Sequence, residues 1–140
     1  MGGQRMAETE RCRILVVDDH PASAEMLVEI LAMEGYAVEV ARCGQEALDL
    51  ARSFMPTLAL LDIGLPDMDG FALARLFKAE AGLQQIRLIA VSGYGQSHDP
   101  KSSQQGCFDR YLIKPVDVEE LLSLLADLSQ SRQPPGGPPA

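Results

Sequence analysis

The sequence predicts an α/β domain built on a five-stranded parallel sheet, and three observations lead to this prediction. Short apolar runs alternate with longer segments of helical period along the whole chain, which is typical of parallel strands joined by helical crossovers. Three of the runs are continuously apolar, as expected for strands covered on both faces. Apolar residues make up 46% of the 140 residues, which suits a single globular domain with an ordinary core.

The predicted strands are short apolar runs bounded by polar or helical segments. They cover Arg13–Val17, Ala37–Val40, Thr57–Leu61, Arg87–Val91 and Arg110–Ile113. The first strand is followed directly by two carboxylates, Asp18 and Asp19. Adjacent negative charges at the end of a buried strand repel each other unless a positive charge lies nearby. The pair therefore already indicates a bound cation.

The predicted helices are recognised by apolar stripes and by the residues that begin or end them. Pro21 suits the first turn of the first helix, which ends at Gly35, and the third helix ends near Gly82. Asp117 with Glu120 resembles a capping box at the start of the last helix. The stripes are Leu27, Ile30 and Leu31; Ala47, Leu48 and Ala51; Phe71, Ala74 and Phe77; and Leu121, Leu122, Leu125 and Leu128.

The fourth crossover differs from the others because residues 95–106 contain no large apolar side chain. Any helix there lacks a stripe with which to pack on the sheet, so we expect it to be short or mobile. Asp99 suits the cap of a turn that begins at Pro100. An ordinary polar loop and a helix that orders on binding both fit this composition.

Both ends of the chain are expected to lie outside the folded domain, which we place at residues 12–129. Residues 1–11 are predicted to be a flexible extension without the apolar stretch of a signal peptide. Residues 130–140 are predicted to be a disordered tail rich in proline and glycine. No apolar run approaches the roughly 18 residues of a membrane span, and the three cysteines lack metal or disulfide spacing. We therefore expect a cytoplasmic protein.

The net charge of −8 limits the classes of partner that the chain can bind. A general affinity for nucleic-acid phosphates or for anionic membranes would have to overcome electrostatic repulsion. We expect protein partners or cationic ligands, and neither nucleic acid nor membrane.

Polar side chains follow four of the predicted strands at the edge where an open parallel sheet binds ligands. They are Asp18 and Asp19 after the first strand, Asp62 after the third, Ser92 after the fourth and Lys114 after the fifth. Each alone is an ordinary turn or cap residue, so their coincidence at one edge is the signal. Clustered carboxylates in oxygen-only company, without histidine, suit Mg²⁺. A metal, a further carboxylate, an ammonium and a hydroxyl together suit phosphoryl transfer, with Asp62 as nucleophile.

Four motifs, in this order, resemble the receiver domains of two-component response regulators: VVDDH, LLDIGLPDMDG, AVSG and YLIKP. The resemblance extends from Ile14 to about Leu128 and implies a doubly wound, flavodoxin-like fold with strand order 2-1-3-4-5. The segments GYGQSHD and KPVD are most similar to receivers attached to hybrid sensor kinases.

The resemblance also implies a chemical role for each residue at the predicted edge. Asp62 matches the aspartate that accepts a phosphoryl group, with Mg²⁺ bound, from a histidine kinase or phosphotransfer protein. The implied metal ligands are Asp19 directly, Asp18 largely through water, Asp62, and the backbone carbonyl of Gly64. Such a protein is a signalling phosphoacceptor that catalyses only its own phosphorylation and dephosphorylation.

The remaining implied roles concern the response to phosphorylation. Lys114 pairs with the phosphoryl group, and its bond to Pro115 is expected to be cis. Ser92 and Tyr111 form the switch pair, in which the hydroxyl turns to the phosphoryl oxygen and the ring follows inward. The downstream partner then binds the last strand and the helices on either side of it. A monomer and a phosphorylation-dependent homodimer both fit.

Three other functions fit parts of the pattern. A phosphatase of the haloacid-dehalogenase type needs a second acid two residues after the nucleophile, where this chain has Gly64. Flavin binding needs a phosphate-cradling loop after the first strand, where Asp18 and Asp19 would repel the phosphate. A receiver that binds proteins independently of phosphorylation stays open as the alternative.

Overall fold

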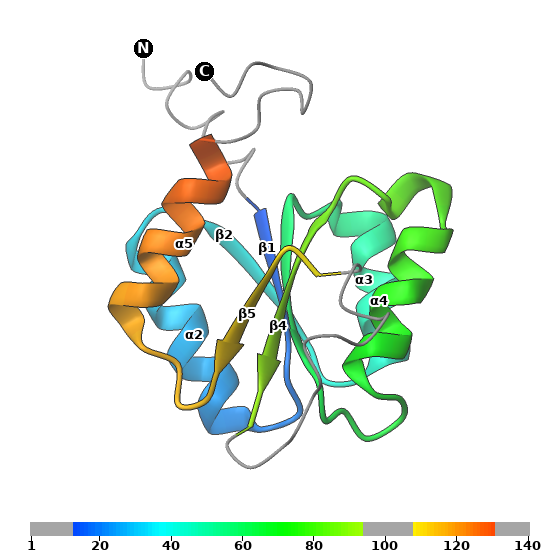
Figure 1. Cartoon of the computed structure of the whole chain (residues 1–140), viewed down its shortest axis with the longest axis horizontal. Coiled ribbons are helices and arrows are strands. Elements are labelled where there is room, and N and C mark those ends of the chain that lie inside the picture. The colour runs from blue at the N-terminus through cyan, green and yellow to red at the C-terminus, as the bar shows by residue number, and fades with distance from the viewer. Residues whose placement is uncertain (1–12, 94–107, 131–140) are drawn as a thin grey trace.

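Five parallel strands form one sheet, and helices cover both of its faces (Figure 1). The structure is a computed structural model that describes residues 13–93 and 108–130. Its elements in chain order are β1 (Arg13–Val17), α2 (Pro21–Met33), β2 (Ala37–Ala41), α3 (Gly44–Phe54), β3 (Leu58–Asp62), α4 (Gly70–Ala79), the 3₁₀ turn η1 (Ala81–Leu83), β4 (Arg87–Ser92), β5 (Arg110–Ile113) and α5 (Val118–Gln130). The predictions for residues 1–11, for residues 95–106 and for residues 131–140 of the tail lie outside the described residues. Gln130, which was expected to begin the tail, is the last residue of α5.

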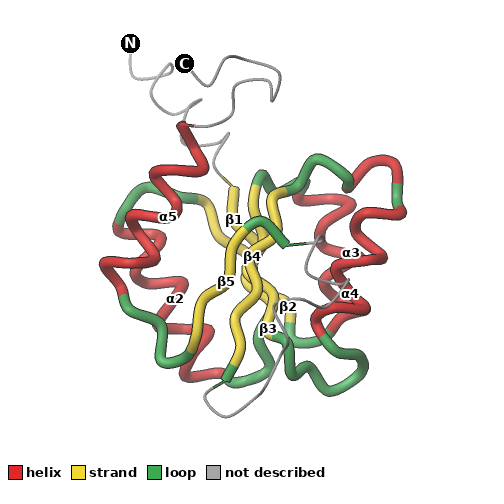
Figure 2. Tube along the Cα trace, viewed as in Figure 1, coloured by secondary structure: helices red, strands yellow, loops and turns green. Residues whose placement is uncertain are grey.

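The strand order is β2-β1-β3-β4-β5, and every neighbouring pair is parallel. This topology confirms the expected doubly wound fold. Helices α2 and α5 pack on one face of the sheet, and α3 and α4 pack on the other (Figure 2). Consecutive strand residues point to opposite faces, so Ile14 and Val16 join the first layer and Leu15 and Val17 join the second. The sheet is therefore buried on both sides, as the continuous apolar runs predict.

The ends of four predicted elements are corrected by the structure. Helix α4 ends at Ala79 and not near Gly82, because Glu80 has extended backbone angles (φ −98°, ψ 126°). Strands β2, β3 and β4 each end one residue later than predicted, at Ala41, Asp62 and Ser92. Strand β3 also begins at Leu58 and not at Thr57. Backbone pairing persists beyond the apolar run, because polar residues at a strand end still take part in the hydrogen-bond ladder. The two polar side chains are therefore fixed by the sheet itself.

The end of α2 and the start of α5 follow the signals in the sequence. Gly35 adopts φ +94° after α2. Tyr36 N–H donates to the Leu31 carbonyl at 3.1 Å and Gly35 N–H donates to the Ala32 carbonyl at 3.0 Å, which is the pair of hydrogen bonds typical of a Schellman turn. At α5 the Asp117 carboxylate accepts from the amide of Glu119 at 2.9 Å. These caps satisfy backbone groups that a helix leaves unpaired.

Candidate functional site

Two buried carboxylates lie at the carboxyl ends of β1 and β3. Asp18 follows β1 directly and Asp62 is the last residue of β3, and these two strands are neighbours in the sheet. Only 4% of either side chain is exposed. Burying a carboxylate is costly unless hydrogen bonds or opposite charge compensate it, so the surroundings of this pair decide what the site can do.

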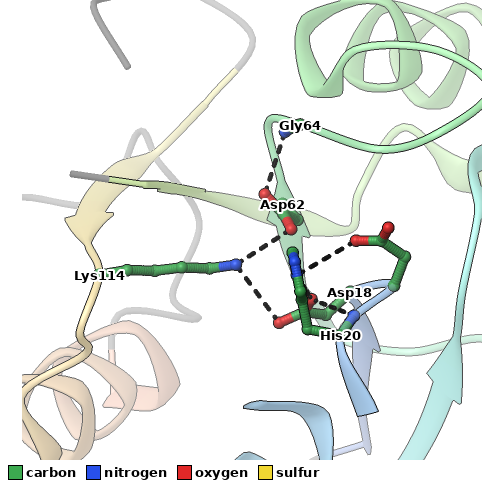
Figure 3. A network of polar contacts seen from close by, with 6 residues as sticks. Asp18, His20, Asp62, Gly64 and Lys114 are labelled. Atoms are coloured by element: carbon green, nitrogen blue, oxygen red, sulfur yellow. Dashed lines mark hydrogen bonds and ion pairs between the residues drawn. The ribbon is translucent and has the colours of Figure 1, made fainter. Parts of the chain in front are cut away.

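Lys114 supplies the compensating charge from the end of β5. Its Nζ lies 3.1 Å from Asp62 Oδ2 and 3.6 Å from Asp18 Oδ2, and its side chain extends from the strand to both carboxylates (Figure 3). The side chain is 23% exposed, so the contact is only partly screened by water. The peptide bond between Lys114 and Pro115 is cis, as the resemblance implies.

The loop that follows β3 holds the second oxygen of Asp62. Gly64 N–H donates to Asp62 Oδ1 at 3.0 Å, and Gly70 N–H donates to the Ile63 carbonyl at 2.8 Å, which closes the loop. Asp69 caps α4 by accepting from the Ala72 amide at 2.7 Å. The orientation of Asp62 is thus fixed by the backbone of its own loop, and its Oδ2 points to Lys114.

Asp19 brings a third carboxylate to the same place. Its Oδ1 is buried and accepts no hydrogen bond from the described residues, although the side chain as a whole is 33% exposed. A buried polar atom without a hydrogen-bond partner needs an explanation, and an ion is one of the usual ones. Ligand atoms of Asp18, Asp19 and Asp62 lie within 4.8 Å of one another. Three carboxylates at this spacing match the oxygen ligands of a hard divalent cation.

The expectation that no histidine lies among the clustered carboxylates is wrong, because His20 joins the cluster. Its Nδ1 lies 3.3 Å from Asp18 Oδ1 and 3.3 Å from Asp19 Oδ1, and it belongs to the same group of candidate ligands (Figure 3). His20 immediately follows the acidic pair in the sequence, which was the available signal. His20 has an extended backbone (φ −97°, ψ 112°) at the cap of α2, and its ring lies beside the carboxylates.

The two residues of the expected switch lie on neighbouring strands. Ser92 is buried at the end of β4, and its carbonyl accepts from the Lys114 amide at 2.8 Å. Tyr111 is half-buried on β5, and its ring centroid lies 5.6 Å from that of Phe108. Phe108 in turn contacts Phe71 of α4 edge to face at 5.5 Å. This aromatic row was not predicted from the sequence, and the functional roles of Ser92 and Tyr111 stay predictions.

Asp67 ties the loop after Asp62 to the first turn of α3. Its carboxylate accepts from the amides of Gly44 at 2.8 Å and Gln45 at 3.1 Å. These bonds, the Gly44 bond above all, hold the pKa of Asp67 below its ordinary value, and the Cys43 side chain adds to the effect. The contact joins the loop that orients Asp62 to a separate helix.

Replacing Asp67 with Ala is expected to lower the free energy of unfolding at pH 7 by about 1 kcal/mol, as for a lost helix cap. Because the folded pKa is depressed, the stabilisation is present above the unfolded pKa of about 4 and is lost as the pH falls. The free energies of unfolding in urea should therefore differ between wild type and variant at pH 7, and the difference should shrink as the pH is lowered. A difference that stays constant with pH would contradict the role of the ionised carboxylate.

Comparison with known proteins gives the same class as the fold and the site. The family of response regulator receiver domains matches residues 14–126. The polar-differentiation response regulator DivK of Brucella ovis is 30% identical over 80% of this chain and 91% of its own length. The DNA-binding response regulator MtrA of Mycolicibacterium smegmatis is 37% identical over 83% of this chain, which covers 50% of that protein.

A solved structure of a receiver domain is similar to this chain over nearly its whole length. The signal receiver domain of a signal transduction histidine kinase from Syntrophus aciditrophicus superposes with a TM-score of 0.77 at 30% identity, over 92% of this chain and 98% of that one. This chain belongs to the response regulator receiver domain family. It is a receiver domain of two-component signalling. Within residues 13–93 and 108–130, no helix is long and apolar enough to cross a membrane.

Proposed function

We propose that Asp62 accepts a phosphoryl group from a phosphohistidine of a histidine kinase or phosphotransfer protein, with Mg²⁺ bound beside it. The observation that carries this proposal is the meeting of a buried carboxylate, a lysine and two further carboxylates at one edge. Asp18, Asp19 and Asp62 would hold the ion, and Asp19 Oδ1, which accepts no hydrogen bond from the described residues, suits a metal ligand. Mg²⁺ would supply positive charge to the phosphoryl oxygens during transfer.

The chain's own residues account for the rest of the reaction. A carboxylate oxygen of Asp62 forms a bond to phosphorus while the phosphorus–nitrogen bond of the donor breaks, and the donor imidazole keeps the electron pair and takes up a proton. The Gly64 amide fixes the Asp62 carboxylate for this attack. Lys114, already 3.1 Å from Asp62 Oδ2, compensates the charge that the phosphoryl group brings. Hydrolysis of the acyl phosphate returns the free carboxylate, so no other substrate is turned over.

Phosphorylation would change the contacts of Ser92 and Lys114. A phosphoryl group adds about 1.5 to 2 negative charges and strong acceptor oxygens. Ser92 and Lys114 gain charge-assisted hydrogen bonds only in that state, and a difference of this kind shifts a two-state equilibrium. The ring of Tyr111 on β5 then moves inward, and the partner binds at β5 and α5. The third predicted part of this surface, residues 95–106, lies outside the described residues. Phosphorylation then controls either a downstream protein or a homodimer at this surface.

Intact mass after incubation with acetyl phosphate tests the proposal. We expect a phosphoryl adduct on the wild type with Mg²⁺, none with EDTA, and none on Asp62→Asn. Asp49→Asn, a change at an exposed aspartate of α3, is the matched control and should keep the adduct. Persistence of the adduct on Asp62→Asn would contradict the assignment of the acceptor. Absence of any adduct, also with phosphorylated kinase as donor, would instead favour the phosphorylation-independent binding module.

A further inference from the structure

We propose that His20 is a metal ligand of this site, which would then bind divalent transition metals through an imidazole nitrogen. The inference rests on the proposed metal site and adds a nitrogen to its oxygen ligands. Its basis is the position of His20 Nδ1, which lies 3.3 Å from one oxygen of Asp18 and 3.3 Å from one oxygen of Asp19. Nothing in the proposed transfer of the phosphoryl group requires this imidazole.

The separations match those within one coordination shell. Two ligands at about 2.0–2.1 Å from a tetrahedral metal lie roughly 3.3 Å apart, and adjacent octahedral ligands lie roughly 3 Å apart. His20 Nδ1 already has this spacing to both carboxylates. The Asp19 Oδ1 in this group is the buried oxygen that accepts no hydrogen bond from the described residues. A metal could therefore bind between the three atoms with little rearrangement.

The ring of His20 contacts the two carboxylates and is open to solvent. Its side chain is 65% exposed, so an ion can approach from solvent. The backbone N–H of His20 donates to Asp18 Oδ1 at 2.9 Å and fixes the main chain, whereas the side chain makes no capping bond to α2. Lys114 contacts the other oxygen of Asp18, Oδ2. The lysine and the imidazole thus use different atoms, and a metal beside His20 does not need to displace Lys114.

The nitrogen ligand changes which ions the site prefers. Imidazole is a good ligand for Ni²⁺, Zn²⁺ and Cu²⁺, whereas Mg²⁺ is bound by oxygen ligands and water. His20 should therefore raise the affinity for transition metals and leave that for Mg²⁺ almost unchanged. An imidazole that only donates a hydrogen bond to the carboxylates would produce no such difference between ions.

Calorimetric titration with Ni²⁺ and, separately, with Mg²⁺ tests the proposal. His20→Gln is expected to weaken Ni²⁺ binding by at least about 10-fold, the smallest loss typical of removing even a residue that only supports a metal ligand, and to change Mg²⁺ binding less than about twofold. His98→Gln, at the chain's only other histidine, is the matched control and should change neither. Asp19→Asn should weaken the binding of both Ni²⁺ and Mg²⁺. Equal Ni²⁺ affinity in wild type and His20→Gln would overturn the proposal.

Direct evidence for the bond comes from the ring nitrogens of ¹⁵N-labelled histidine. Adding diamagnetic Zn²⁺ should shift the Nδ1 resonance of His20 to a metal-bound position, and Mg²⁺ should not. If the Nδ1 resonance of His20 does not shift while Mg²⁺ still binds, His20 is not a metal ligand and the proposed function is unaffected. A wild type that binds no Mg²⁺ and forms no phosphoryl adduct would overturn the shared metal site instead.

Discussion

In buffer without divalent cations, Lys114→Met is expected to lose about 3 kcal/mol of unfolding free energy, at the low end for breaking a buried ion pair. Asp18 and Asp62 are each 4% exposed at the side chain, and the Lys114 ammonium is the cation that contacts both. Methionine retains much of the apolar stem but leaves the two carboxylates uncompensated. The partial exposure of Lys114, 23%, is the reason for expecting the low end.

Mg²⁺ should restore much of this loss, because a cation in the site replaces the missing charge and no ammonium competes with it. Urea unfolding of wild type and Lys114→Met, each in EDTA and in saturating Mg²⁺, measures both effects. The gain from Mg²⁺ should be larger in the variant. Lys78→Met, a partly buried lysine of α4, is the matched control and should cost less than about 1 kcal/mol. A Lys114→Met protein as stable in EDTA as the wild type would contradict this account.

The strands and the edge of the site were predictable because both depend on patterns that the sequence displays directly. Continuous apolar runs mark strands buried on both faces, and parallel strands place their carboxyl ends together. Asp18, Asp62 and Lys114 follow or end such runs, so their meeting follows from topology alone. The strand order itself came from the family resemblance, since alternation of strands and helices does not determine it.

His20 could not be placed in the same way. Topology brings a chain segment to the edge of a sheet, but the direction of a side chain at a helix cap depends on local backbone angles. The backbone of His20 is extended, and its side-chain conformation places the ring beside Asp18 and Asp19. The row of Phe71, Phe108 and Tyr111 was not predicted for a related reason. Contacts between residues far apart in the sequence can be recognised only once the packed fold is known.

The close packing of α4 against β3 leads to the second large effect. Gly70 is the first residue of α4, and a Cβ there would lie 2.8 Å from Ile63 Cα and 2.9 Å from the Asp62 carbonyl oxygen. Both are backbone atoms, which cannot move aside as the end of a side chain can. The backbone that carries the acceptor aspartate therefore passes too close to the helix for any side chain at this position.

Gly70→Ala is expected to lower the free energy of unfolding by roughly 2–3 kcal/mol, within the range for overpacking. This outcome opposes helix propensity, since Ala within a helix is normally favoured over Gly by about 1 kcal/mol. Gly82→Ala is the matched control, because a Cβ there would meet no heavy atom within 4 Å. Its free energy of unfolding should stay equal or rise by up to about 1 kcal/mol.

The same pair of variants separates packing from chemistry. A Cβ at Gly70 must push on the Asp62 carbonyl, so the carboxylate that Gly64 orients should be displaced as well. We expect Gly70→Ala to form the phosphoryl adduct more slowly than Gly82→Ala at a temperature where both are folded, because small displacements of a reacting group are costly. Equal rates with unequal stabilities would show that the loop relaxes without moving Asp62. Equal stabilities would contradict the close approach of α4 to β3 itself.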